Sequence, residues 1–252
     1  DHSLRAGDSL VGLSRQQIAD FHWKRTKEKR LGQEHIKERI QRATTARKEI
    51  LDAGDSIPPE EKAQKLAVAE EALHAVRFFG NLCIAAFFAG KKDKQRKEKR
   101  DEYLDRLTVY LGSGDPRQRP SVQIDALQVP SSDNPSPVSP FHWEVEFPEV
   151  FGRDAPGFDG FVGNPPFAGK NTLIASNREH YLDWLKVVHP RSHGNSDLVA
   201  HFFRRCFDLV RDGGTFGLIA TNTIRQGDTR STGLRWICVH GGTIYAARRR
   251  YK

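Results

Sequence analysis

Apolar residues recur at intervals of three and four positions between residues 14 and 111, a spacing that predicts helices rather than strands. Ser14 and Gln17 have the spacing of a capping box, which predicts the start of the first helix. Residues 52–59 contain Gly and a Pro-Pro pair, so we expect a break there between two long helices. A tight break of this kind predicts an antiparallel helical hairpin. A third, very polar helical segment is expected over residues 91–110.

Each long helix of the expected hairpin has a stripe of the kind that is typical of a buried helix face. In the first helix this stripe contains Ile36, Ile40, Ala43, Arg47, Ile50 and Leu51. In the second helix it contains Leu66, Ala69, Leu73, Val76 and Phe79.

The pattern changes after residue 111. Residues 112–140 are rich in Gly, Pro and Ser and are predicted to be a linker, and the composition shifts again at Phe141. Continuous apolar runs predict buried strands at residues 158–162 and 215–221. Between them we expect a helix from Leu198 to Val210, capped at residues 195–197 and ended by Gly213-Gly214, which makes a right-handed crossover unit. Another helix is predicted at residues 229–236 and another strand at residues 243–247.

The net charge of +8 and the sequence pI of about 9.5 favour a polyanionic partner, because phosphate neutralisation drives nucleic-acid binding. The strongest basic run is residues 91–100. This run fits contact with DNA phosphates. It also fits a solvated helix face with some acidic pairing, and we prefer this second interpretation.

Cys83, Cys206 and Cys238 are far apart and each lies among apolar residues, so we expect buried free thiols in a reducing, cytoplasmic compartment. The longest apolar run, residues 78–89, is too short to span a bilayer, so no membrane partner is expected. The chain contains no Met and starts at Asp1, which suggests a piece of a longer protein.

The residues that follow the expected strand at 158–162 have unusual chemistry. Asn164 offers a carbonyl acceptor and an amide donor. Pro165 and Pro166 make the turn stiff and have no N–H, so their carbonyls remain as acceptors. Phe167 supplies a flat apolar face. Because ligands bind beyond the carboxyl ends of strands in open α/β sheets, this group suits a planar base that carries an amino group.

The tetrapeptide Asn164-Pro165-Pro166-Phe167 resembles the catalytic motif of the amino-group DNA methyltransferases, in the form typical of the adenine branch. Residues 147–151, 195–198 and 213–219 resemble segments that surround this motif in large type IIG-like restriction-modification methyltransferases. The resemblance implies transfer of a methyl group from S-adenosylmethionine to the N6 amine of a flipped adenine in double-stranded DNA. It also implies that the four motif residues are catalytic and that Asn222-Thr223 lies at a strand end near the base pocket.

The resemblance also gives a meaning to Gly7-Asp8-Ser9-Leu10, because methyltransferases often carry a similar segment at the end of the third strand. Asp8 would then hydrogen-bond the adenine amine of the cofactor. The same four residues fit a serine hydrolase with Ser9 as nucleophile, but no Asp-x-x-His occurs to supply the base. A simple turn is the third interpretation.

The resemblance implies an α/β fold: a partial Rossmann-like methyltransferase sheet with a long helical insertion. We expect residues 1–13 to end the cofactor-binding half, 14–111 to be the insertion, 112–140 the linker and 141–252 the catalytic half. The Gly-rich cofactor loop of the family is absent, so its strands are expected upstream, and a target-recognition domain downstream. We therefore expect the chain alone to bind cofactor poorly and to be inactive.

Three alternatives remain open from the sequence. The substrate could be RNA or a protein glutamine, because the same tetrapeptide serves those families. The chain could also be a non-catalytic remnant whose basic helices bind nucleic acid. No metal site is expected: His142, Glu144 and Glu146 alternate on one segment, but no second His is near.

Overall fold

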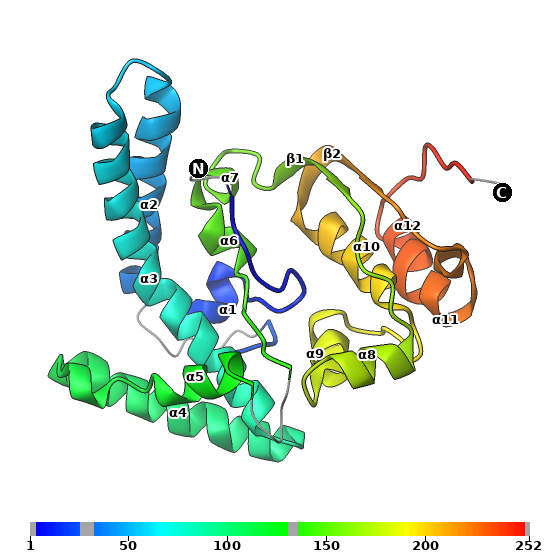
Figure 1. The fold of residues 1–252 in the computed structure, drawn as a ribbon, viewed down its shortest axis with the longest axis horizontal. Coiled ribbons are helices and arrows are strands. Elements are labelled where there is room, and N and C mark those ends of the chain that lie inside the picture. The colour runs from blue at the N-terminus through cyan, green and yellow to red at the C-terminus, as the bar shows by residue number, and fades with distance from the viewer. Residues whose placement is uncertain (1–3, 26–32, 131–135, 250–252) are drawn as a thin grey trace. The chain divides into compact units, whose positions relative to one another are not determined.

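The computed structural model describes residues 4–25, 33–130 and 136–249, and the chain forms two compact units (Figure 1). Unit 1 comprises Asp1–Pro156 and Asn177–Val188, and unit 2 comprises Gly157–Ser176 and His189–Lys252. Unit 1 contains α1 (Arg15–Ala19), α2 (Gln33–Ala53), α3 (Pro59–Ala89), α4 (Asp93–Ser113), η1 (Pro116–Gln118), α5 (Val122–Gln128), α6 (Trp143–Glu146), α7 (Pro148–Phe151) and α9 (Tyr181–Val188). Unit 2 contains β1 (Phe158–Gly163), α8 (Lys170–Ser176), α10 (Leu198–Leu209), β2 (Val210–Leu218), η2 (Asn222–Arg225), α11 (Gly227–Arg230), the π-helical turn η3 (Ser231–Arg235) and α12 (Trp236–Val239).

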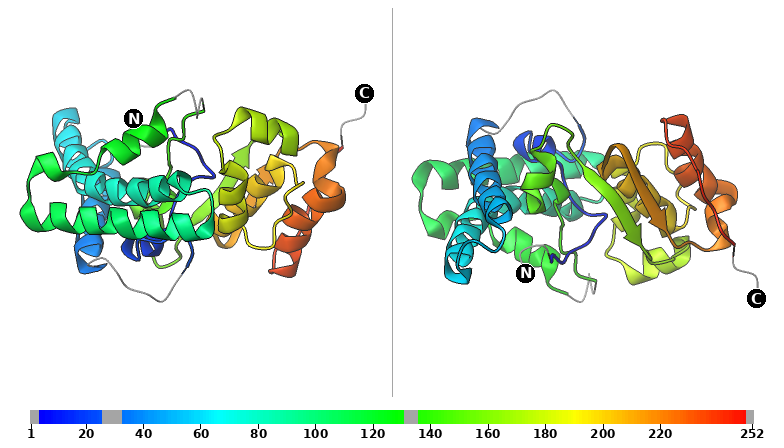
Figure 2. Two further views of the ribbon diagram at one scale, coloured as in Figure 1. Left: turned by 90° about the horizontal axis from the view of Figure 1, so that it is seen from below. Right: turned by 90° about the horizontal axis from the view of Figure 1, so that it is seen from above.

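The helical hairpin that the sequence predicts is present in unit 1, where α2 and α3 pack along each other (Figure 2). The capping box of α1 is also confirmed: the Ser14 hydroxyl accepts from the Gln17 amide at 3.2 Å, and the Gln17 side chain accepts from the Ser14 amide at 2.9 Å. α3 begins with Pro59, and acidic side chains in its first turn complement the positive end of the helix. These local signals were therefore sufficient to place the helices.

The second half of α3 forms the core of unit 1. Nearly every side chain from Phe78 to Phe88 is buried. Among the described residues, α3 is the one helix long and apolar enough to cross a membrane, but 72% of its apolar window is buried inside the structure. This is the burial expected of the central helix of a folded unit.

The region after α4 is more ordered than a linker. Residues 112–140 include η1 and α5, and Ile124 and Leu127 of α5 are buried. The contact-based units divide at Gly157, whereas we expected the boundary at Phe141. The assignment of residues 14–111 as an insertion and 141–252 as a catalytic half therefore stays a prediction.

Unit 2 is organised by a parallel pair of strands, in which Gly160 is opposite Thr215 and Gly163 is opposite Leu218. The parallel pairing with α10 between the strands matches the expected crossover. A Rossmann-like order cannot be read from two strands, so it remains a prediction for the part of the chain that the structure describes.

The prediction that both strands are buried was wrong. Val162 is 98% exposed, and every other described strand residue is half-buried or exposed. The physical reason is that α10 packs on β2, with Phe203 edge-on to Phe216 at 6.0 Å between ring centres, while Val162 has no such cover. A continuous apolar run records the tendency to be buried but not which element does the burying.

Two further predictions in unit 2 need correction. α10 ends at Leu209 rather than at the Gly213-Gly214 pair, which lies within β2 where the register is irregular. Residues 243–247 form no strand, and all five are exposed. Without a neighbouring strand, the apolar residues of this segment have no partner for ladder hydrogen bonds.

Candidate catalytic site

The Asn164–Phe167 segment leaves the sheet at the carboxyl end of β1 and is held by hydrogen bonds at both ends. On one side, the Gly163 carbonyl accepts from the Ile219 amide at 3.0 Å. On the other side, the Ala168 amide donates to the Asp197 carboxylate at 3.2 Å and the Ala168 carbonyl accepts from the Leu198 amide at 2.9 Å. The stiff Pro-Pro turn is therefore fixed to β2 before it and to the start of α10 after it.

Between these fixed ends, the Asn164 and Phe167 side chains are exposed to solvent. Asn164 is exposed, and no described residue forms a hydrogen bond with its side chain. Phe167 is 41% exposed and has no aromatic partner among the described residues. Pro165 is buried and Pro166 is exposed. The position thus combines a rigid backbone with an amide and a ring that are available to a ligand.

The start of α10 holds this segment through one carboxylate oxygen. Asp197 caps α10, and its Oδ1 accepts from the Val199 amide at 3.0 Å as well as from Ala168. The Asp197 amide in turn donates to the Thr229 hydroxyl at 3.0 Å. From sequence we predicted the cap but missed the bond to Ala168, because it joins residues 29 positions apart.

Asn222 and Thr223 follow β2 at the same edge of the sheet, because β1 and β2 are parallel. Both residues are exposed, and the Thr221 and Thr223 hydroxyls are 2.6 Å apart. They lie in the helical turn η2, four and five positions after the last residue of β2, and their place near a base pocket stays a prediction.

Asp8 lies in unit 1, apart from the unit that carries Asn164–Phe167. Its carboxylate accepts from the Leu10 amide at 2.9 Å and from the Tyr181 hydroxyl at 2.9 and 3.1 Å. Tyr181 belongs to α9, which is also fixed by a 2.9 Å bond from the Trp184 indole N–H to the Leu10 carbonyl. The sequence named Asp8 but gave no signal for Tyr181, which is 173 residues away.

Two buried histidines of unit 2 form a relay that does not open to solvent. The Nδ1 atoms of His189 and His201 are 2.9 Å apart, and His201 Nε2 is 3.3 Å from the Ser196 hydroxyl. The Ser196 hydroxyl donates to the His193 carbonyl, so His201 carries its proton on Nε2 and His189 donates through Nδ1. Burial lowers the pKa of His201 to about 3 and the pKa of His189 in the same direction, so both rings are neutral. This arrangement is a packing feature rather than a catalytic base.

The other candidate groups have structural partners. His142 is buried, accepts from the Leu13 amide at 3.0 Å and lies 3.0 Å from the Asn81 side-chain oxygen. Glu144 accepts from the Arg15 amide and Glu146 pairs with Arg77 at 2.6 Å, and no described group of three such residues is arranged to hold a metal.

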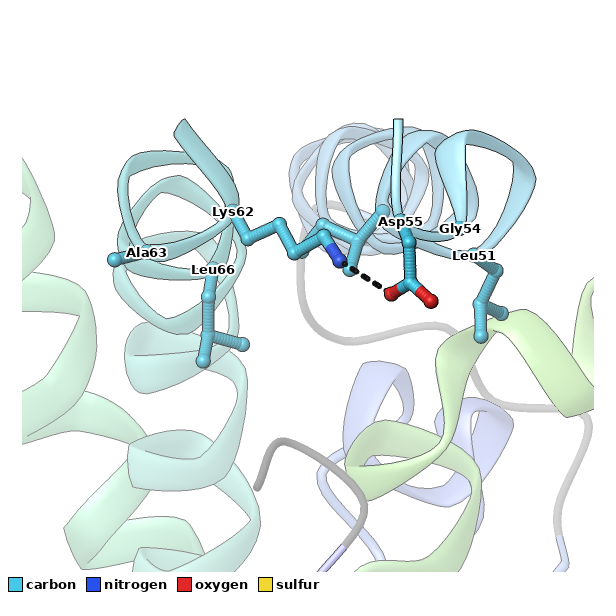
Figure 3. A pocket seen from close by; sticks show the side chains of 7 residues that line it. Leu51, Gly54, Asp55, Lys62, Ala63 and Leu66 are labelled. Atoms are coloured by element: carbon cyan, nitrogen blue, oxygen red, sulfur yellow. Dashed lines mark ion pairs between the residues drawn. The ribbon is translucent and has the colours of Figure 1, made fainter. Parts of the chain in front are cut away.

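A cavity of about 350 Å³ lies at the end of the α2–α3 hairpin where the two helices are connected, and Lys62 and Asp55 form a 3.5 Å ion pair there (Figure 3). Its lining comes from the ends of these two helices and the turn between them, including Leu51, Gly54 and Leu66. A functional pocket is expected to combine apolar walls with several convergent polar groups. The cavity therefore belongs to the hairpin and is separate from the candidate site.

Comparison with known proteins identifies the family to which the chain belongs. A family model described as Eco57I restriction-modification methylase matches residues 90–237, which is more than half of the chain and includes Asn164–Phe167. The chain therefore belongs to the Eco57I restriction-modification methylase family. No curated protein and no solved structure matches the chain.

Proposed function

We propose that the chain is the catalytic part of an adenine-specific DNA methyltransferase that transfers a methyl group from S-adenosylmethionine to the N6 amine of a flipped adenine. The observation that carries this proposal is the strand-end segment, in which Asn164 and Phe167 face solvent while both flanking residues are fixed. A restriction-modification or phage-defence system is the setting that the family implies.

The chemistry of the segment matches the problem that an exocyclic amine presents. Its lone pair is delocalised into the ring, so the amine is a poor nucleophile. The Asn164 side-chain oxygen and the Pro165 carbonyl are two acceptors for the two amine hydrogens, which makes the nitrogen more tetrahedral and its lone pair more available. Phe167 offers a face on which a flipped base stacks, which offsets the few kcal/mol needed to unpair it. Alignment of the amine with the methyl group accounts for most of the rate.

S-adenosylmethionine supplies the electrophilic methyl group, and the residue proposed to hold its adenine is Asp8. The Asp8 carboxylate can accept from such an amine, because it already accepts from a donor: the Tyr181 hydroxyl bonds both carboxylate oxygens, as the adenine amine would. In the proposed complex Asp8 accepts from that amine, and Tyr181 and Leu10 keep the carboxylate oriented. The residues fit, although the Gly-rich loop that normally cradles the rest of the cofactor does not occur in this chain.

The decisive experiment compares Asn164→Ala with Asn171→Ala in the full natural protein. Both side chains are exposed amides, and Asn171 lies on α8, just beyond the segment. We expect Asn164→Ala to reduce transfer of tritiated methyl groups to duplex DNA by at least about 100-fold, since misaligned reactants lose about that much. Asn171→Ala should retain activity, and both variants should bind cofactor as the parent does.

Retained turnover in Asn164→Ala would refute the proposed role of the amide. The digested product identifies the base: N6-methyladenine is expected, and methylation of cytosine, RNA or protein alone would refute the assignment of adenine in DNA. Titration calorimetry of S-adenosylmethionine into residues 1–252 tests the separate expectation that this chain binds cofactor poorly, and micromolar affinity would contradict it.

A further inference from the structure

The excess positive charge of the chain is concentrated in unit 2. This unit contains twelve Lys and Arg, five Asp and no Glu, which gives +7 of the total +8. The Lys-rich segment at residues 91–100, which is the strongest basic run in the sequence, lies in the nearly neutral unit 1. The unit with most of the net positive charge is therefore not the unit that contains the strongest basic run of the sequence.

The basic run of α4 is largely used within unit 1. Arg96 is 4% exposed and donates to the Gly90 carbonyl and to Asp183, and Arg100 is 2% exposed and pairs with Asp101. Two of the Lys residues that remain outside have acidic partners on the same helix: Lys94 lies 4.0 Å from Glu98, and Lys99 lies 2.9 Å from Glu102. α4 thus has the mixed-charge pattern of a solvated helix face.

Unit 2 presents a different surface, which we call the arginine ridge: Arg225, Arg230 and Arg235. All three side chains are exposed, and no described carboxylate lies within ion-pair distance of any of them. Most of the Asp residues of the unit are engaged elsewhere: Asp159 with Arg211, and Asp228 near His193 at 3.6 Å. The charges of the ridge are therefore available to a partner outside the molecule.

The backbone under the ridge is rigid and turns the arginines outward. Residues 227–239 form one nearly continuous helix whose inner face is anchored: the Thr229 hydroxyl accepts from the Asp197 amide, and the Thr232 hydroxyl accepts from the His193 amide at 2.9 Å. Gly233 approaches Ala200 of α10 so closely that an added Cβ would lie 3.2 Å from its methyl group. The remaining face carries Arg230 and Arg235.

The π-helical turn η3 explains the spacing of these two arginines. Arg230 and Arg235 are five residues apart, which places side chains on different faces of a regular α-helix. An i→i+5 turn widens the helix and brings positions five apart closer to alignment, and such turns are often found at functional sites. Arg225 is the last residue of η2, seven positions after the carboxyl end of β2, and Asn164–Phe167 leaves β1 at the same edge of the sheet.

We propose that the arginine ridge holds the phosphate backbone of the duplex whose base is methylated at the Asn164–Phe167 segment. This inference rests on the proposed function and adds the surface that positions its substrate. Arginine suits the role, because its planar guanidinium donates in pairs to phosphate oxygens. The contacts carry no sequence information: they position the duplex and leave base recognition to other residues.

The test measures binding of the full natural protein to a fluorescein-labelled duplex by anisotropy at several salt concentrations. The ridge variant is Arg225→Gln, Arg230→Gln and Arg235→Gln together. The matched control is Lys91→Gln, Lys94→Gln and Lys97→Gln, just before and within the start of α4, which removes the same charge from positions that are also exposed. Because each lost phosphate contact lowers the salt slope by about 0.9, the ridge variant is expected to lower it by about 2.7 and to weaken binding more than about tenfold.

The control variant should bind within about threefold of the parent, since its lysines act only through the general field of the protein. Replacing the three ridge residues by Lys should restore most of the affinity, because a phosphate contact needs positive charge first. If both Gln variants weaken DNA binding equally, binding depends on net charge alone, and the proposed role of the arginine ridge is wrong. A ridge variant that binds as the parent does would also overturn it while leaving the methyltransferase proposal intact. No binding by the parent would refute duplex DNA as the substrate and the ridge with it.

Discussion

Replacing Asp197 by Ala tests whether the start of α10 holds the candidate catalytic segment, Asn164–Phe167. The Asp197 Oδ1 atom accepts from two amides, Val199 at 3.0 Å and Ala168 at 3.2 Å, and the side chain is 8% exposed. Loss of a helix cap costs about 1 kcal/mol. An amide left without a partner costs about 1–3 kcal/mol, and the lower end applies because Ala168 is only half-buried. We therefore expect the free energy of unfolding of unit 2 to fall by about 2 kcal/mol.

The matched control is Asp197→Asn, because Asn keeps an oxygen at the Oδ1 position and caps helices as well as Asp does. Urea denaturation gives the stability, and hydrogen-exchange mass spectrometry of peptides covering residues 164–170 reports on the segment itself. Asp197→Ala should speed exchange at the Ala168 amide and Asp197→Asn should not. Stability within about 0.5 kcal/mol of the parent, the range of an ordinary surface change, together with unchanged exchange in Asp197→Ala, would refute the clamp.

Two further predictions concern ionisable groups. Three buried histidines have pKa values below their usual range, chiefly through burial: His142 at about 4, His201 at about 3, and His189. As the pH falls, these histidines take up protons in the unfolded chain before they do so in the folded chain. The stability that comes from the neutral histidines is therefore complete above about pH 6.5 and is lost as the pH falls toward 4. Thermal unfolding at about pH 7 and 5.5 should show a loss of about 1 kcal/mol per histidine, and equal stability would contradict the neutral state. Only the exposed Cys238 should react with a thiol reagent in the native chain, since Cys83 and Cys206 are buried. Burial also raises the pKa of Cys206 to about 12. Labelling of all three cysteines would contradict the burial of Cys83 and Cys206.

Local sequence was sufficient for the α2–α3 hairpin and α4 but not for α5 or for the polar partners of these helices. The stripe of α2 was predicted with Arg47 in it, and Arg47 is 1% exposed. Its guanidinium donates to the Glu146 carbonyl at 2.5 Å and lies 3.2 Å from the Glu149 carboxylate. A buried guanidinium needs such partners. Periodicity predicts which face of a helix is buried, but it does not identify a hydrogen-bond partner about a hundred residues away.

The candidate site shows the same division between local and distant information. Asn164–Phe167 was found because its chemistry is contained in four consecutive residues. The Asp197 clamp and the Tyr181 hydroxyl on Asp8 join residues far apart in sequence, and neither follows from a spacing. The exposure of Val162 was missed for a related reason, because the covering of a strand is decided by elements elsewhere in the chain.

Asn164 and Asp8, the residues proposed to bind the base and the cofactor, differ in whether they already have a hydrogen-bond partner. Asn164 is presented without a protein partner among the described residues, on a backbone fixed at Gly163 and Ala168, so a base amine meets acceptors that need little rearrangement. Asp8 already accepts the Tyr181 proton, so a cofactor amine has to share or replace that donor. Because α9 follows Asn164–Phe167 in the chain and carries Tyr181, one stretch of sequence contains both the proposed base-binding residues and the residue that bonds the Asp8 carboxylate.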